Sequence, residues 1–159
     1  MTLWMRTHTF SKFKGGNTMF QKIGLPYSLN ALEPYYNEET LKLHYDVLYA
    51  GYIDNANKVE GELQTARDTN DFSNIKCLEK NLSFFGSGAI LHELFFLNLK
   101  PESMQSNPST ELIEYINRDF GSFEKFKNQF SAAAENVEAS RMVLTCMGSI
   151  NSKIASTAM

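Results

Sequence analysis

The sequence predicts an all-α fold: a long antiparallel helical hairpin followed by two or more shorter helices. Two long segments carry apolar residues at helical spacing, at about residues 38–67 and 82–99, and these predict the hairpin. Two shorter amphipathic segments follow, at about 111–120 and 123–136. No alternating pattern typical of a strand occurs before residue 140, so we expect no sheet in that part of the chain.

Composition narrows the class of protein. The formal net charge of -3 argues against nucleic acid as the main partner, because phosphate binding requires a basic face. Two cysteines are too few for a disulfide framework, which favours a reducing, cytoplasmic setting. The first residues lack the apolar run of a signal peptide, and residues 83–99 are too short and polar to cross a membrane. We therefore expect no membrane partner.

The first long helix should begin after Asn37, a residue type that favours the N-cap position, and should end at about Arg67. Four residues recur at a spacing of four and should share one face of this helix, namely His44, Leu48, Tyr52 and Ala56. A glycine inside a helix costs about 1 kcal/mol relative to alanine. Gly51 therefore suggests close packing at that point.

The second arm should consist of a short helix at about residues 72–80 and a long helix at about residues 82–99. One stripe of the long helix contains Phe85, Ala89, His92 and Phe96. Glycines at 86 and 88 should allow a neighbouring backbone to come close, and the aromatic residues of this helix, Phe84 among them, should lie in the core. If the two arms face each other, the imidazoles of His44 and His92 are placed to hold a metal ion.

Other interpretations of the histidines are weaker or remain open. From the pattern alone, histidines such as His44 and His92 are more often hydrogen-bonded core or boundary residues than metal ligands. His92-Glu93 begins like a His-Glu-x-x-His zinc motif, but Phe96 stands where the second histidine is required. A di-iron bundle needs Glu-x-x-His pairs, and Ala89 and Leu41 occupy the glutamate positions.

The C-terminal helices have clear boundary signals. Ser109 or Thr110 should cap a helix that ends before Gly121, and Ser122 should cap the next helix.

Several blocks of sequence resemble those of the iron/manganese superoxide dismutases, both in their order and in the spacing between them. The resemblance extends over about residues 24–140. These blocks are LPYSLNALEP, LKLHY, the later Tyr52, FFGSGAILHELFFLNL and INRDFGSFEKFKNQFSAAA. The resemblance implies the dismutation of superoxide to oxygen and hydrogen peroxide at a mononuclear manganese or iron site. It also implies that His44 and His92 are metal ligands and that Tyr52 gates substrate entry, and members of the family are oligomeric.

The chain departs from the family pattern at informative positions. The family's gateway histidine is replaced by Leu48, its asparagine before the second ligand by Leu91, and its pocket tryptophan by Phe96. The histidine after Glu-Pro is Tyr35, whereas Gly88 matches the manganese-type members. The family's Asp-x-Trp-Glu-His-Ala-Tyr-Tyr motif, which carries two further ligands, does not occur in the sequence. We therefore expect impaired activity; the alternative is a metal-free helical remnant with only a structural or interaction role.

Four regions are expected along the chain. Residues 1–18 form a loose arm, interpreted as translated leader, because residues 14–19 can be encoded by a ribosome-binding sequence before an ATG. Residues 19–104 form the helical hairpin domain, and residues 105–140 the first helices of the C-terminal domain. Residues 141–159 are interpreted as a frameshifted tail, because one possible coding sequence gives Gly-Trp and an apolar strand in the next frame. In the family, the C-terminal domain carries part of the oligomer interface, and we expect this chain to lack that part.

Overall fold

A computed structural model of the chain describes residues 20–137, 143–147 and 154–158. These residues belong to two compact units, one ending at Gln105 and the other beginning at Ser106. The leader expected at residues 1–18 lies outside the described residues, and so do residues 138–142, 148–153 and 159 of the C-terminal region.

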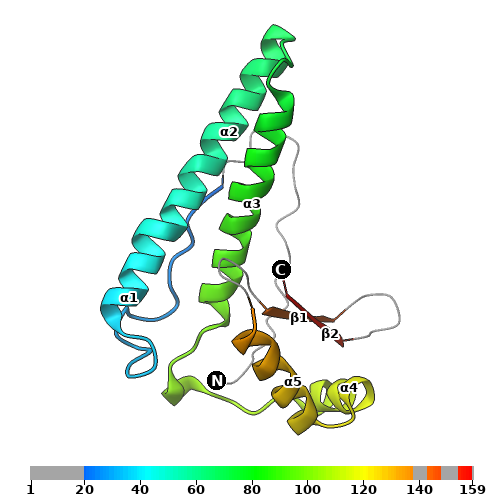
Figure 1. The fold of residues 1–159 in the computed structure, drawn as a ribbon. Helices are drawn as coiled ribbons and strands as arrows, with labels where there is room; N and C mark the ends of the chain where they lie inside the picture. Colours follow the sequence, from blue (N-terminus) through cyan, green and yellow to red (C-terminus); the bar gives the residue numbers. More distant parts are fainter. Residues whose placement is uncertain (1–19, 138–142, 148–153, 159) are drawn as a thin grey trace. The chain divides into compact units, whose positions relative to one another are not determined.

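The first unit is an antiparallel helical hairpin (Figure 1). Its first arm runs without a break through α1 (Glu38–Lys42), η1 (Leu43–Tyr49) and α2 (Ala50–Thr69). The second arm is α3 (Ile75–Asn98), which packs along α2. The expected hairpin is therefore confirmed.

The ends of the first arm follow from its sequence. The Asn37 side chain accepts a hydrogen bond from the Thr40 backbone N–H at 2.8 Å, which satisfies one of the free donors of the first turn. At the other end, Asn70 adopts a left-handed conformation with φ of 52°, a conformation that asparagine tolerates better than most residues. The Asp71 N–H then bonds to the Ala66 carbonyl and closes the helix.

Two apolar clusters hold the hairpin together. The cluster nearer α1 contains six buried residues, namely Leu32, Leu41, Tyr49, Ile53, Ala89 and Phe96. The cluster nearer the hairpin turn contains Val59, Leu63, Ala66 and Leu78. The histidines of interest lie on the same stretch of the hairpin as the first cluster.

The second arm differs from the prediction, because α3 is one helix and not a short helix followed by a long one. Residues 72–74 form the turn into this helix, and no glycine or proline interrupts the sequence from Ile75 to Ser83. Continuous i to i+4 hydrogen bonding is therefore possible across residues 80–82. Pro101 follows the helix and is succeeded by a short 3₁₀ turn, η2 (Glu102–Met104).

The first arm also departs from a regular α-helix, because η1 is a π-helix of seven residues. A π-helix has more residues per turn, so the buried face passes from His44 to Tyr49 rather than to Leu48. Tyr49 is fully buried, whereas Leu48 is 56% exposed. The prediction that Leu48 shares the face of His44 and Tyr52 was therefore wrong.

Two packing expectations were also wrong. A Cβ atom added at Gly51 would meet nothing within 4 Å, so no close packing explains that glycine. Phe84 is 57% exposed and does not belong to the core. Its ring nevertheless lies beside that of Tyr52, with centroids 5.7 Å apart.

The second unit contains α4 (Thr110–Phe120) and α5 (Phe123–Glu135), each close to its expected bounds. Ser109 and Ser122 cap these helices through their hydroxyl groups, and Gly121 ends α4 with φ of 83°. The rings of Phe120 and Phe126 meet at 5.0 Å between the two helices.

Two antiparallel strands complete the second unit, β1 (Val143–Met147) and β2 (Ile154–Ala158). Val143 pairs with Ala158 and Met147 with Ile154, and both strands contact α5. The expected helices are confirmed, but the strands are additional to an all-α description. They lie after residue 140, beyond the part of the chain in which the sequence excluded strands.

Among the described residues, no helix combines the length and the apolar character that a membrane span requires.

Candidate metal centre

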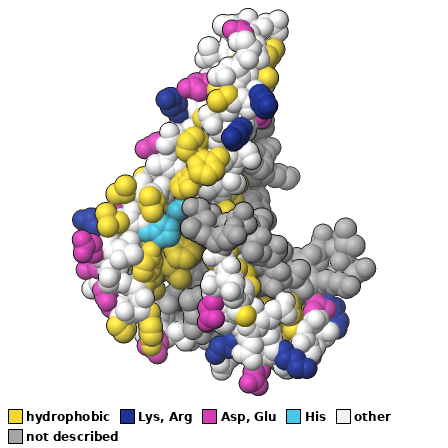
Figure 2. Space-filling model, in the orientation of Figure 1, with side chains coloured by type: hydrophobic (Ala, Val, Ile, Leu, Met, Phe, Trp, Pro, Cys, Tyr) yellow, Lys and Arg dark blue, Asp and Glu magenta, His cyan; other side chains and the backbone are white. Residues whose placement is uncertain are grey.

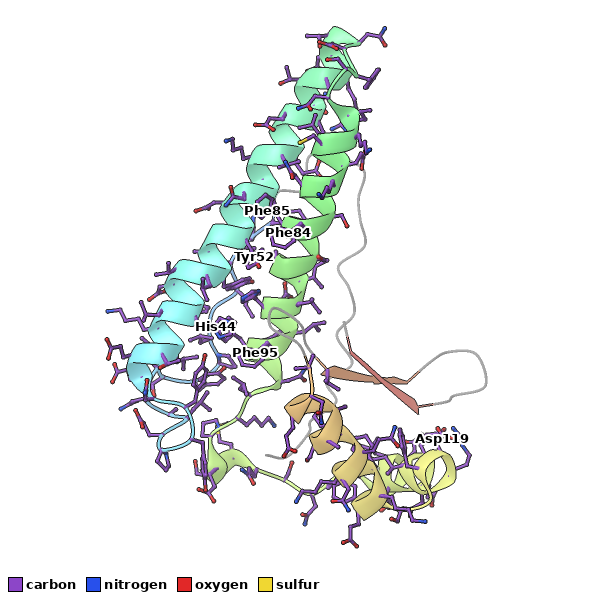
Figure 3. The ribbon with its side chains drawn as sticks, in the orientation of Figure 1. His44, Tyr52, Phe84, Phe85, Phe95 and Asp119 are labelled. Carbon is purple, nitrogen blue, oxygen red and sulfur yellow. The ribbon has the colours of Figure 1, made fainter. Side chains whose placement is uncertain are left out.

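The three expected site residues come together between the two arms of the hairpin. His44 projects from η1 and Tyr52 from α2, and both face His92 on α3. The ring centroid of His92 lies 4.9 Å from that of His44 and 4.8 Å from that of Tyr52. Figure 3 shows His44 and Tyr52 pointing from the first arm toward α3, where Phe84, Phe85 and Phe95 are labelled.

The orientation of His92 is fixed by its own helix. Its Nδ1 lies 2.7 Å from the Gly88 carbonyl oxygen, one turn earlier. A carbonyl oxygen only accepts hydrogen bonds, so Nδ1 carries the proton and Nε2 keeps its lone pair. The ring also stacks on Tyr49, with centroids 5.9 Å apart and planes 7° from parallel. His92 is therefore prepared to bind a metal ion through Nε2.

His44 is held by side chains from other segments. Its Nδ1 lies 2.7 Å from the hydroxyl oxygen of Tyr36. The centroid of its ring lies 5.1 Å from the ring centroids of both Phe95 and Phe96. Burial lowers the pKa of His44 below its ordinary value, and the nearby His92 lowers this pKa further. Both effects favour the neutral imidazole, which is the form that binds metal ions.

Gly88 is required by the position of the Tyr52 ring. A Cβ atom at residue 88 would lie 2.3 Å from two carbon atoms of that ring, a distance at which one group must move. A Cβ atom at Gly86 would similarly meet the Phe20 ring at 3.2 Å. The glycines thus admit aromatic rings, and the expectation that they admit a neighbouring backbone was wrong.

The donor set fits a metal ion in part. Neutral imidazole suits iron as well as zinc and copper. Within residues 20–137 and the two described strands, no group of three or more His, Cys, Asp or Glu side chains is placed to hold an ion. Histidine is visible at the surface among hydrophobic side chains in Figure 2. His44 and His92 thus offer two nitrogen ligands in a mainly aromatic setting.

Two contacts of the site were not predicted from the sequence. Tyr36 lies before the first helix, so helical periodicity gave no reason to place it against His44. Tyr49 stacks on His92 from the π-helical η1, whereas a regular α-helix would have placed Leu48 one turn after His44. Tyr35, at the position where the resemblance implies a histidine, is 79% exposed.

Comparisons with known proteins match this chain to one family. The α-hairpin domain of iron/manganese superoxide dismutases matches residues 19–100, and the C-terminal domain of the same proteins matches residues 108–158. The iron superoxide dismutase of Methanothermobacter marburgensis is 43% identical over 117 residues, which cover 73% of this chain. The manganese/iron enzyme of Propionibacterium freudenreichii subsp. shermanii is 42% identical over 117 residues and 73% of this chain. The iron enzyme of Pyrobaculum aerophilum is 41% identical over 115 residues, covering 72% of this chain.

The matched segment covers only part of the length of each of these relatives. It spans 58% of the first two and 54% of the third.

Proposed function

Because this chain belongs to the iron/manganese superoxide dismutase family, we propose that it binds manganese or iron through His44 and His92 and dismutates superoxide. One observation carries the proposal: two histidines from separate arms meet with ring centroids 4.9 Å apart. Each has its Nδ1 engaged in a hydrogen bond, which leaves Nε2 as the nitrogen that can meet a metal ion.

The two imidazoles would bind the ion, and the aromatic residues around them would limit water. When bound, iron or manganese supplies one-electron chemistry in which one superoxide is oxidised to oxygen and another is reduced, with two protons, to hydrogen peroxide. Tyr52 is the proposed gate for substrate, because its ring lies against His92 and is held over Gly88. We propose activity below that of the full-length relatives, since only two nitrogen ligands are supplied by the described residues.

The histidines provide a direct test. The purified chain would be loaded with Mn²⁺ or Fe²⁺, and its metal content and superoxide dismutation would be measured beside His44→Ala and His92→Ala. His8→Ala is the matched control, because no role is assigned to that histidine. We expect both site variants to lose metal and activity and the control to retain them.

The rival proposal, a metal-free helical protein with a structural role, would be favoured if the unmodified chain bound neither ion. Full activity in His44→Ala or His92→Ala would also contradict the proposed site. A cytoplasmic location and an oligomeric assembly remain predictions, which cell fractionation and light scattering would test.

A further inference from the structure

The two site histidines have hydrogen-bond partners of different kinds. His92 Nδ1 faces a backbone carbonyl at 2.7 Å, and this oxygen can only accept. His44 Nδ1 faces the Tyr36 hydroxyl at 2.7 Å, and this group can donate or accept. The tautomer of His92 is therefore fixed by its own helix, whereas that of His44 depends on the direction of the bond to Tyr36.

We propose that Tyr36 is a positioning residue that governs which nitrogen of His44 carries the proton, and that it supports metal binding at Nε2. The proposal rests on the proposed function, in that His44 is taken to bind a metal ion. Tyr36 would not itself be a ligand and would act only through His44.

The same hydroxyl can serve both states of the site. In the metal-free chain the Tyr36 O–H donates to Nδ1, so the imidazole proton is on Nε2. When Nε2 binds a metal ion, its proton leaves to water and Nδ1 takes a proton from water. The hydroxyl then rotates and accepts from Nδ1–H, so the numbers of protons on the imidazole and on the phenol do not change.

Tyr36 is held firmly enough to act in this way. Its backbone N–H bonds to the Leu32 carbonyl at 3.0 Å, and the next residue, Asn37, caps α1. Its ring meets the edges of Phe95 and His44, each at a centroid distance of 6.4 Å. The preceding residue, Tyr35, is exposed and supplies a matched control with the same chemistry.

The test uses nitrogen-15 NMR of the histidine side chains in the full chain, at a pH where the imidazoles are neutral. In the metal-free chain we expect the proton of His44 on Nε2 and that of His92 on Nδ1. Tyr36→Phe should shift the Nδ1 resonance of His44 toward that of a nitrogen without a hydrogen bond. Tyr35→Phe should leave it unchanged.

Zinc, which is redox-silent, then serves as the metal probe. On adding Zn²⁺ the proton of His44 should move to Nδ1, whereas that of His92 should stay there. Loss of such a supporting bond typically costs about 10–100-fold in metal affinity, and we expect Tyr36→Phe to lose this much and Tyr35→Phe almost nothing.

An unchanged His44 spectrum in folded Tyr36→Phe would overturn the proposal, as would equal zinc affinity in the two variants. If Tyr36→Phe does not fold, the unmodified chain decides: a His44 proton that is already on Nδ1 without zinc would overturn it. A chain that binds no zinc would contradict the metal site itself. The metal-free spectra would then still show whether Tyr36 governs the tautomer of His44.

Discussion

At the scale of single residues, the contact between Gly88 and Tyr52 sets how the site is packed. Alanine at residue 88 would bring a Cβ atom to 2.3 Å from the Tyr52 ring, and the displacement typical of overpacking costs about 1–3 kcal/mol. Gly51 is the matched control, because a Cβ atom there meets nothing and the helix gains about 1 kcal/mol from alanine.

We therefore expect Gly51→Ala to raise the free energy of unfolding and Gly88→Ala to lie about 1–3 kcal/mol below it, as measured by urea denaturation. Equal stability of the two variants would show that the Tyr52 ring moves aside without cost.

The pKa of His44 gives the metal-free chain a defined pH dependence. Because burial and His92 hold this pKa below the ordinary 6.5, the unfolded chain binds more protons between the two values. Stability should therefore be highest above pH 6.5 and should fall as the pH decreases through and below that value. Urea denaturation at a series of pH values would measure this fall, and His44→Ala should reduce it. A His44→Ala profile parallel to that of the unmodified chain would contradict the assignment.

The sequence predicted the site residues but not how they are held. His44, Tyr52 and His92 were identified through family motifs, and the structure places their rings beside one another. Tyr36 could not be found in this way, because its contact with His44 depends on the path of the chain before α1. A hydrogen bond between a loop and a helix leaves no periodic pattern in the sequence.

At the scale of elements, the π-helical η1 decides which side chain enters the core. Tyr49 is fully buried, and replacing a buried aromatic residue by alanine typically costs about 3–5 kcal/mol. Leu48 is mostly exposed, and a surface substitution usually changes stability by less than about 0.5 kcal/mol.

We expect Tyr49→Ala to lower the free energy of unfolding by about 3–5 kcal/mol and Leu48→Ala by less than about 0.5 kcal/mol, as measured by chemical denaturation. A regular α-helix through His44, with Leu48 buried, would give the larger loss at Leu48.

The order of the helices could be predicted, whereas their internal regularity could not. Caps at Asn37, Ser109 and Ser122 are local signals, and each side chain makes the expected hydrogen bond. The π-helical η1 has no comparable capping or periodic signal in its sequence. Residues 80–82 continue α3 because neither glycine nor proline occurs between Ile75 and Ser83.

At the scale of the whole molecule, the hairpin contains what its own stability requires. Both buried apolar clusters lie before Gln105, and every contact described for His44, Tyr52 and His92 lies there as well. Helical stability in proteins comes mainly from packing of this kind and not from the propensity of isolated helices.

We therefore expect a fragment of residues 19–105 to fold alone. Circular dichroism should show a helical spectrum and a cooperative urea transition, and zinc affinity should equal that of the full chain. His44→Ala in the fragment is the control that should abolish zinc binding. The second unit has a smaller core of its own, around Ile116 and Phe126. A fragment that unfolds without cooperativity, or that folds but loses zinc affinity, would show that residues after Gln105 help to build the site.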